Sequence, residues 1–497
     1  MAYVIGIDLG TSAVKTLLVD RDGDVRAEAS AEYPLFREHS GWSEQNPEDW
    51  VNGTAEALRR LLQASGIQGS EVEGISFSGQ MHGLVLLDEE GVPVRRAILW
   101  NDTRTTEQCR EIERVLGEKL LGITRNPALE GFTLPKLLWV RLHEPEAFRR
   151  SKLFLLPKDY VRYRLTGALH MDYSDAAGTL LLDVAEKRWS RDILAAFELQ
   201  PELCPPLAES HEQVGTLLPA MAERIGLVPA VKVFAGGADN ACGAIGAGIL
   251  SEGKSLSSIG TSGVLLTYIE DKRADYGGKV HFFNHGKENA YYAMGVTLAA
   301  GYSLSWFKQT FAAGESFDEL LRGIDGIKPG AGGLLFTPYL VGERTPHADP
   351  HIRASFVGMD GSHTRGHFTR AVMEGITFSL NETVETFRAA GKTIDSVVSI
   401  GGGAQNPLWL QMQADIFGAT VIAIHSEQGP GLGAAMLAAY GCGWFASLEA
   451  CAACFVKHAA SYSPDPDAVR TYRELFGIYR QIYEQTRGIN EQLAAFR

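Results

Sequence analysis

One aspartate and two glycine-rich turns are the residues best suited to chemistry in this sequence. Asp239 follows the apolar segment 231–235 and the pair Gly236–Gly237. We expect its carboxylate at the end of a strand, where α/β sheets bind their ligands, and in that place it could take a proton from a hydroxyl. Aspartate is equally common as a helix cap, so the residue pattern alone leaves both roles open.

A Gly-Thr-Ser turn between two apolar strands occurs twice. The segments 7–14 (IDLGTSAV) and 257–264 (SSIGTSGV) share it at a separation of 250 residues. The glycine lets a ligand approach the backbone closely, and successive amides and hydroxyls can face an anion. Each turn alone is also typical of an ordinary hairpin, whereas two facing each other would clamp a polyphosphate. The candidate phosphate contacts are Gly10, Thr11, Ser12, Lys15, Gly260, Thr261, Ser262 and Gly263.

Asp8 stands directly in front of the first of these turns. A carboxylate there would repel phosphate, so its presence predicts a divalent cation, Mg²⁺ with its water shell, between the two. The second turn has Ser258 at the position of Asp8. The metal is therefore expected at the first turn alone.

A third glycine-rich loop, 401–404, follows another apolar strand pattern. Bare backbone of this kind can lie against a purine or a ribose, which makes Gly402, Gly403 and Asn406 candidate contacts to adenosine. A plain strand-to-helix turn with Pro407 at the helix start explains the loop equally well.

The segment 248–255 (GILSEGKS) matches the P-loop pattern but has the wrong surroundings. A P-loop needs a strand before it and a helix after it, because the helix N-terminus holds the phosphate. Here a Gly/Ala-rich helical pattern comes first and a strand follows. We therefore expect no P-loop at this place.

Internal repetition indicates how the chain is organised. The segment 75–80 is echoed by 398–403, in the same order as the two Gly-Thr-Ser turns. Helical patterns at 47–63 and 364–390 alternate with these strands, which predicts an α/β protein of two related halves. The small-residue run 235–248 is expected to form a hinge helix. It separates an N-terminal domain, 1–247, from a C-terminal domain, 248–497.

The composition excludes several classes of protein. With 46 Lys and Arg against 60 Asp and Glu, the net charge is -14, and no basic stripe offers itself to nucleic acid. Six scattered cysteines, and a start without a basic and apolar leader, predict a cytoplasmic protein. The apolar segment 434–456 is long enough to span a membrane, but its Gly-Cys-Gly break predicts two short buried helices instead.

Two patterns near the C-terminus have structural rather than functional interpretations. Cys451, Cys454 and His458 share helical spacing, but zinc wants four ligands, so buried thiols are expected. The aromatic stripe 472–483 is typical of a helix that faces the core or another subunit.

Several motifs together resemble the FGGY carbohydrate kinases over nearly the whole chain. Besides the two turns they are 100–104 (WNDTR), 136–139 (KLLW), 236–240 (GGADN) and 401–403 (GGG). The resemblance implies two actin-like (ribonuclease H-like) domains, with ATP and a sugar in the cleft between them. The one departure is Ala238, where a third glycine is common, and its methyl group should not move the carboxylate.

Carried over to these positions, the resemblance makes Asp239 the base and Asp8 the Mg²⁺ site. The sugar contacts are Met81, His82, Asp239 and Asn240, with Trp100 as an apolar wall. The implied reaction is transfer of the ATP γ-phosphate to the C5 hydroxyl of D-xylulose, and a homodimer is the family habit. Another ketose, a polyol or a sugar acid is the alternative acceptor. A non-catalytic ATP-binding protein of the actin fold and a sugar-sensing regulator are the alternatives outside catalysis.

Overall fold

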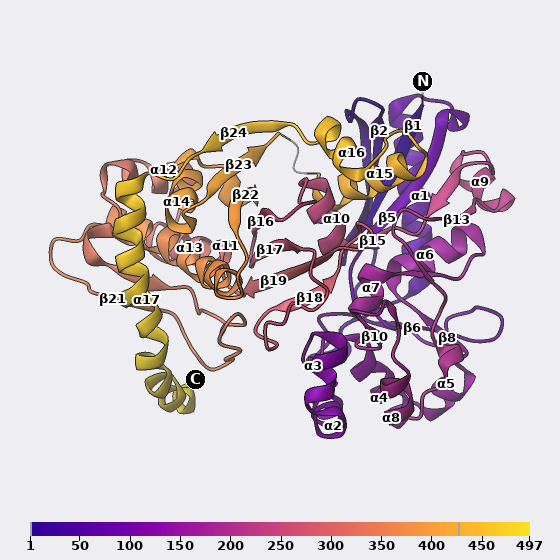
Figure 1. The fold of residues 1–497 in the computed structure, drawn as a ribbon, viewed down its shortest axis with the longest axis horizontal. Coiled ribbons are helices and arrows are strands. Elements are labelled where there is room, and N and C mark those ends of the chain that lie inside the picture. The colour runs from indigo at the N-terminus through magenta and orange to yellow at the C-terminus, as the bar shows by residue number, and fades with distance from the viewer. Residues whose placement is uncertain (1, 426–427) are drawn as a thin grey trace.

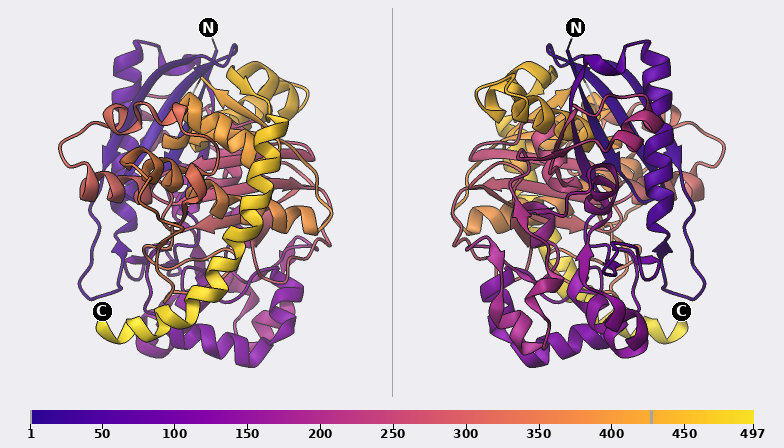
Figure 2. Two further views of the ribbon diagram at one scale, coloured as in Figure 1. Left: turned by 90° about the vertical axis from the view of Figure 1, so that its left-hand side faces the viewer. Right: turned by 90° about the vertical axis from the view of Figure 1, so that its right-hand side faces the viewer.

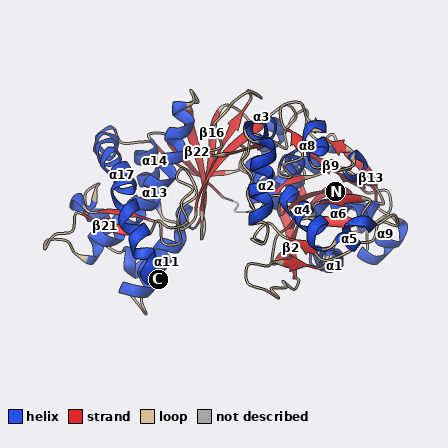
Figure 3. Ribbon diagram, turned by 90° about the horizontal axis from the view of Figure 1, so that it is seen from below, coloured by secondary structure: helices blue, strands red, loops and turns tan. Residues whose placement is uncertain are grey.

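The two largest sheets are mixed and have seven strands each, one at either side of Figure 1, and the other strands described form two-stranded sheets. The computed structural model describes residues 2–425 and 428–497. Seen from below, the two sheets lie in separate lobes, each with its own helices (Figure 3). The expected fold of two α/β domains is thereby confirmed.

The first sheet is built from strands between residues 3 and 238. Its order is β13 (Gln213–Thr216), β14 (Lys232–Phe234), β5 (Val72–Gly79), β1 (Tyr3–Leu9), β2 (Ala13–Asp20) and β3 (Val25–Glu32), with the short β15 (Gly237–Ala238) also on β5. The central strands β1 and β5 run parallel and are buried nearly throughout, as sheets covered on both faces require.

The second sheet is built from strands between residues 253 and 462. Its order is β18 (His281–Asn284), β19 (Tyr291–Thr297), β17 (Gly263–Ile269), β16 (Gly253–Ile259), β22 (Ile394–Gly401), β23 (Thr420–Ile424) and β24 (His458–Tyr462). The antiparallel pair β16–β17 carries the second Gly-Thr-Ser turn, just as β1–β2 carries the first.

The two sheets share one topology around these hairpins. In each, the first hairpin strand pairs in parallel with a later strand that ends in a small-residue loop: β1 with β5, and β16 with β22. The registers correspond, since Leu9 is opposite Gly79 and Ile259 is opposite Gly401. Both sequence echoes therefore mark equivalent places in two related halves.

The ends of α1 (Pro47–Ser65) and the burial of α13 (Arg365–Ala389) follow from their sequences. Asn46 caps α1 at its N-terminus, and Gly66 ends it in the left-handed conformation at φ 70°. The long α13 is buried over most of its length, because it packs between the second sheet, α14 (Pro407–Phe417) and α17 (Pro466–Leu493). Both helices match the expected segments within a few residues.

Residues from late in the chain return to the first sheet. The helix α15 (Gly429–Gly441) packs on β1 and on α10 (Asp239–Gly246), and α16 (Leu448–Phe455) follows it beside the first hairpin (Figure 1). Contact with β1 is so close that a methyl group on Gly6 would overlap the Gly431 carbonyl oxygen. The segment 434–456 thus contains two short buried helices, as its sequence predicts.

Further helices lie at the ends and on the outside of the two domains (Figure 1, Figure 2). A helical region of the first domain, with α2 (Thr106–Leu116), α3 (Glu118–Thr124) and α4 (Thr133–His143), lies below the first sheet in Figure 1. The C-terminal α17 runs along the outside of the second domain (Figure 2) and buries Tyr472, Phe476 and Tyr479 against it. Among the described residues, no helix combines the length and the apolar character needed to cross a bilayer.

Candidate functional site

The cleft between the two domains is lined by all five residues expected to contact the sugar. Its volume is about 470 Å³. The first domain contributes Met81, His82, Trp100, Asn101, Asp102, Thr103, Leu129, Glu130, Gly131, Phe132, Asp239 and Asn240, and the second contributes Ser262, Val264, His281, Phe283, Met294, Val296 and Arg344. One cavity therefore brings together the expected base, the expected sugar contacts and a residue of the second Gly-Thr-Ser turn.

Asp239 is the first residue of α10 and directly follows β15. Its Oδ1 accepts hydrogen bonds from the backbone nitrogen (2.7 Å) and from Nδ2 (3.0 Å) of Asn240. Within the ranges that the structure describes, Oδ2 has no hydrogen-bond partner. One oxygen thus orders the start of the helix while the other is available to the cleft, so the two roles left open by the sequence are compatible.

The environment of Asp239 tunes its acidity. Burial, and next the negative charge of Asp8, raise the pKa of Asp239 to about 7, against a smaller opposing effect of the Asn240 N–H. A carboxylate with such a pKa is suited to accept a proton near neutral pH.

A buried hydrogen-bond chain holds the backbone just before Asp239. The Oγ of Ser174, in α7 (Tyr173–Ala177), accepts a hydrogen bond from the Ala238 nitrogen at 2.9 Å. The same hydroxyl donates to Asp172 Oδ2, which also accepts from Ser210 Oγ at 3.0 Å. Sequence analysis missed these residues, because they lie far from Ala238 along the chain and have no distinctive local pattern.

This series of hydrogen bonds leads from Asp172 to a fully buried ionic cluster centred on Lys158, in α6 (Pro157–Thr166). Its Nζ lies 2.7 Å from Asp159 Oδ1, 2.7 Å from Asp172 Oδ1 and 2.9 Å from Asp175 Oδ2. Arg162 adds a second cation and donates to the Ala235 carbonyl at 2.6 Å. Although these three carboxylates could converge on a metal, the lysine ammonium already occupies their centre. Burial raises the pKa of Asp175 well above its usual value, which leaves the cluster neutral.

His82 is a neutral hydrogen-bond acceptor. Its Nδ1 lies 2.6 Å from the Gly178 carbonyl oxygen, which can only accept, so Nδ1 carries the proton. Burial, and next the charge of Lys136, lower the pKa of the ring to about 3, so Nε2 is unprotonated. Lys136 Nζ and Thr133 Oγ1 also donate to the His82 carbonyl at 3.0 and 3.1 Å, which holds its backbone at φ 69°.

The loop that carries Trp100 is fixed by the other residues of its motif. Asp102 accepts from the Ser43 nitrogen at 2.6 Å and forms a bidentate ion pair with Arg104. The Arg104 guanidinium in turn stacks over the Trp42 ring at 3.6 Å. Trp100 can therefore stay 45% exposed at the cleft without being free to move.

Two buried glutamines form hydrogen bonds with Thr11 of the first Gly-Thr-Ser turn. Gln45 Nε2 donates to the Thr11 carbonyl at 2.7 Å, and Gln80 Oε1 accepts from the Thr11 hydroxyl at 3.2 Å. Trp100 Nε1 donates to that hydroxyl at 2.9 Å. Because the Thr11 hydroxyl is engaged on both sides, the turn offers an anion chiefly its backbone amides and the exposed Ser12.

Asp8 lies opposite Ser78 in β5 and opposite Lys15 in β2. Burial raises the pKa of Asp8, while the Ser78 hydroxyl and the charge of Lys15 oppose the rise. The Lys15 ammonium is itself engaged at the surface, 2.6 Å from Gln428 Oε1 and 3.1 Å from Glu28 Oε2. The structure thus places Asp8 near the carboxyl end of β1, outside the residues that line the cleft, and Lys15 in a surface ion pair.

The second turn and the third glycine-rich loop share a cavity of about 370 Å³. Its lining contains Gly260, Thr261, Gly402, Gly403 and Asn406, all expected from the sequence, together with Tyr302, Phe317, Leu321 and Trp409, which were not. Tyr302 and Phe317 are 40% and 44% exposed, so an apolar wall stands open beside bare backbone. Such a combination suits a flat heteroaromatic ring.

Three hydrogen bonds explain how this cavity is built. The amides of Gly301 and Tyr302, at the start of α11 (Gly301–Phe311), donate to the carbonyls of Gly260 (2.8 Å) and Thr261 (3.1 Å). Asn406 caps α14 by accepting from the Trp409 nitrogen at 3.1 Å. The carbonyls of the second turn are thereby satisfied inside the domain.

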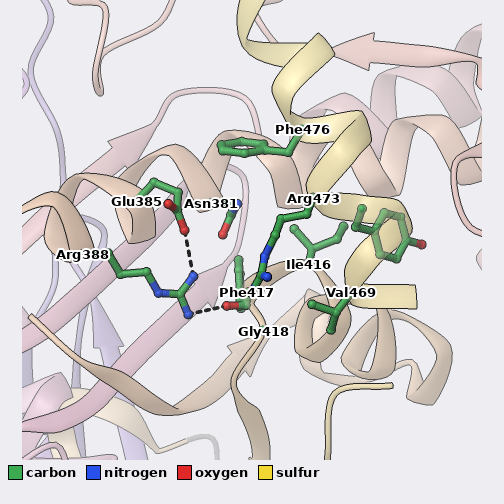
Figure 4. A pocket seen from close by; sticks show the side chains of 10 residues that line it. Asn381, Glu385, Arg388, Ile416, Phe417, Gly418, Val469, Arg473 and Phe476 are labelled. Atoms are coloured by element: carbon green, nitrogen blue, oxygen red, sulfur yellow. Dashed lines mark hydrogen bonds and ion pairs between the residues drawn. The ribbon is translucent and has the colours of Figure 1, made fainter. Parts of the chain in front are cut away.

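Other candidate features lie outside the cleft. A cavity of about 390 Å³ between α13 and α17 contains the Glu385–Arg388 ion pair but no residue of either turn (Figure 4). In the segment 248–255, α10 precedes and β16 follows, the reverse of a P-loop. Cys451 is buried in α16, whereas His458 belongs to β24 and pairs with Ile424, so these residues share no helix.

Comparisons with known proteins agree on one family. The model of the N-terminal domain of the FGGY family of carbohydrate kinases matches residues 3–246, and the C-terminal domain model matches residues 256–442. The chain is 62% identical over 497 residues to the xylulose kinase of Bacillus subtilis (strain 168), covering all of both chains.

Solved structures of sugar kinases have the same fold as this chain. The ligand-bound xylulose kinase from Lactobacillus acidophilus superposes with a TM-score of 0.94 at 27% identity, over 99% of this chain and all of the other. A gluconate kinase from Lactobacillus acidophilus reaches 0.92, also at 27% identity, over 98% of each chain. Structural likeness alone therefore does not choose between sugars.

Proposed function

Because the chain belongs to the FGGY family of carbohydrate kinases, we propose that it transfers the γ-phosphate of ATP to the C5 hydroxyl of D-xylulose. The observation that carries the proposal is the single cleft in which Asp239, Met81 and His82 face Ser262 of the second Gly-Thr-Ser turn. Full-length identity of 62% to a xylulose kinase supports D-xylulose over the other sugars of the family.

Asp239 is the general base of this proposal. Its Oδ2 takes the proton of the C5 hydroxyl as that oxygen bonds to the γ-phosphorus and the bond to the ADP leaving oxygen breaks. Asn240 holds Oδ1, so the carboxylate has a fixed orientation when the hydroxyl arrives. A positioned base of this kind contributes about 10²- to 10⁴-fold to a rate.

The two turns hold the phosphates from opposite domains, with the nucleoside in the second domain. Residues 10–12 and 260–263 face the phosphates, and the adenine lies in the cavity beside Tyr302 with Gly402, Gly403 and Asn406 at the adenosine. The amides of Gly10 and Gly260 already donate to the carbonyls of Ala13 and Ser262, so the amides offered to phosphate are those at 11–12 and 261–262. The buried carboxylate of Asp8 fits Mg²⁺, which prefers oxygen ligands and, when bound, neutralises phosphate charge.

The first-domain side of the sugar site combines one acceptor with apolar walls. His82 Nε2 accepts a hydrogen bond from a sugar hydroxyl, and Met81 and Trp100 contact C–H faces. Closure of the two domains would exclude water, which limits wasteful hydrolysis of ATP. We also propose that the domain boundary lies between residues 247 and 248. We further propose that the protein is a homodimer, which a measurement of its mass in solution tests.

The proposal is tested by ADP release with D-xylulose, D- and L-ribulose, L-xylulose, L-fuculose, gluconate and glycerol. We expect the highest kcat/KM with D-xylulose and little ADP without sugar. Asp239→Asn should bind both substrates and lose at least 10²-fold in kcat. A higher kcat/KM with another acceptor would replace the substrate, and ADP release independent of sugar would favour a non-catalytic ATP-binding protein of the actin fold.

A further inference from the structure

The cleft contains two polar side chains from the second domain that the proposed mechanism does not use. We propose that His281 and Arg344 complete the sugar site and that Arg344 selects ketoses over the corresponding polyols. The inference rests on the kinase activity proposed above, and deepens it by naming residues that would select its acceptor.

His281 is held in place by a residue of the first domain. It opens β18, the edge strand of the second sheet. Asn126, which is fully buried, accepts from the Phe282 nitrogen at 3.2 Å and donates to the Phe282 carbonyl at 2.7 Å, as a neighbouring strand would. Its Oδ1 also lies 3.2 Å from His281 Nδ1. The edge strand is thereby fastened to the sugar-binding side of the cleft.

This contact decides what His281 presents to a ligand. An amide oxygen can only accept, so Nδ1 of His281 carries the proton. Burial, and next the positive charge of Arg344, lower the pKa of the ring to about 3, so the ring is neutral. Nε2 of His281 is therefore an acceptor, like Nε2 of His82 from the first domain.

The two imidazoles belong to one wall of rings. His82 and Phe132 have centroids 4.6 Å apart, and His281 stacks on Phe283 at 5.7 Å with 16° between the planes. Phe132 and Phe283 lie 6.2 Å apart and join the two pairs. A hydroxylated chain bound here meets two acceptors set in apolar surface, and a sugar offers that pattern of hydroxyls and C–H groups.

Arg344 is pinned by its neighbours while its guanidinium stays free. Buried Glu343 Oε1 accepts from the nitrogens of Leu298 (3.0 Å) and Arg344 (2.7 Å), and the Thr345 nitrogen donates to the Val296 carbonyl at 3.1 Å. Among residues 2–425 and 428–497, the guanidinium has neither a hydrogen bond nor an ion pair. It lines the same cavity as both imidazoles, and its charge contributes to lowering the pKa of each.

The donors of the cleft explain what this guanidinium would recognise. Trp100 Nε1 is engaged by Thr11, and Asn240 Nδ2 by Asp239 and Met81. The two imidazoles offer acceptors only, so they suit hydroxyl groups. The carbonyl oxygen of a ketose can only accept, so of these groups only Arg344 can bond to it. The hydroxyl of the reduced polyol can accept from Arg344 or donate to an imidazole. Binding of the ketose therefore depends more on Arg344 than binding of the polyol does.

The test compares D-xylulose with xylitol and D-arabinitol, the two products of reducing its carbonyl. We measure the dissociation constant of D-xylulose and the competitive inhibition constants of both polyols, with the KM for ATP. In Arg344→Met we expect the constant for D-xylulose to rise about 10- to 100-fold, as for a hydrogen bond to a charged group, and those for the polyols to change less than about threefold. Arg344→Lys should recover part of the loss.

His281→Ala should weaken the ketose and the polyols alike, by about 10-fold, because it removes an acceptor for a hydroxyl. The matched control is Arg273→Met, whose side chain is 84% exposed outside the cleft, and it should change none of these constants. The KM for ATP should stay within about twofold in all variants.

Equal losses for ketose and polyols in Arg344→Met, or no loss, would overturn the role of Arg344 while leaving the kinase activity intact. If the wild-type enzyme prefers another ketose, the same comparison applies to that ketose and its two polyols. A wild-type enzyme that phosphorylates no ketose would overturn the proposed substrate together with this inference.

Discussion

The negative charge of Asp8 raises the pKa of Asp239, although the two carboxylates belong to different strands and helices of the first domain. Asp8 belongs to β1 and Asp239 begins α10, and both lie near the carboxyl end of β5, since Asp8 is opposite Ser78 and the residue before Asp239 is opposite Gly79. The group proposed to hold Mg²⁺ and the group proposed to take the proton are therefore coupled electrostatically. Anything that neutralises Asp8 makes Asp239 the stronger acid.

This coupling predicts the titration of Asp239. In the protein without metal, the carboxyl resonance that is lost in Asp239→Asn should titrate with a midpoint near 7 in ¹³C NMR of aspartate-labelled protein. Asp8→Asn removes a nearby negative charge and should lower that midpoint, and Mg²⁺ added to the wild type should act in the same direction. A midpoint near 4 in the metal-free wild type, or no response to Asp8→Asn, would contradict the coupling.

Asp239→Asn should stabilise the protein while it abolishes turnover. The pKa of Asp239 is higher in the folded state than its unfolded value, so its contribution favours folding at low pH and is lost as the pH rises towards 7. At pH 8 the wild type carries a buried charge that asparagine lacks, and we expect the melting temperature of the variant to be about 3 °C higher. At pH 5 the difference should be smaller.

The control is Asp192→Asn on the exposed face of α8 (Arg191–Ala196), which should leave the melting temperature unchanged at both pH values. A melting temperature of Asp239→Asn below that of the wild type at pH 8 would show that the carboxylate is stabilised in the folded state.

Ser174 should act on catalysis through position alone. In Ser174→Ala the Ala238 nitrogen loses its acceptor, and the backbone before Asp239 is free to shift. We expect kcat to fall about 10-fold, the KM for ATP to stay within about twofold and the variant to remain folded. Ser65→Ala, which removes a hydroxyl bonded to the Leu62 carbonyl at the end of α1, is the control. An unchanged kcat in Ser174→Ala would remove Ser174 from the positioning of the base.

The sequence predicts those parts of the site whose signal is local. Residue type and spacing within a few positions define the two Gly-Thr-Ser turns and the approach to Asp239, and the structure places them at equivalent edges of two similar sheets. Lys15 shows the limit of such reasoning. Lys15 follows the first Gly-Thr-Ser turn closely, which predicted a phosphate contact, but its ammonium contacts Glu28 and Gln428 at the surface.

Features that depend on contacts across the fold could not be predicted. Ser174 meets Ala238, and Asn126 meets His281, only because separate parts of the chain pack together. The return of α15 to the first sheet has the same character, since small residues in its sequence predict close packing but not the partner. The sequence assigned no role to Arg344, because the cleft that it lines is formed by residues far from it along the chain.

Lys158 should be among the most important single residues for stability. Lys158→Met leaves three buried carboxylates with Arg162 as the sole cation of the cluster, so we expect the free energy of unfolding in urea to fall by about 3–5 kcal/mol at pH 8. Acid should reduce the loss, because protonation neutralises the unpaired carboxylates. The control is Lys152→Met. Lys152 is exposed just before β8 (Leu153–Leu155), and its replacement should lower the free energy of unfolding by less than about 0.5 kcal/mol. A loss in Lys158→Met no larger than in the control, or one that grows as the pH falls to 5, would show that the cluster does not need its lysine.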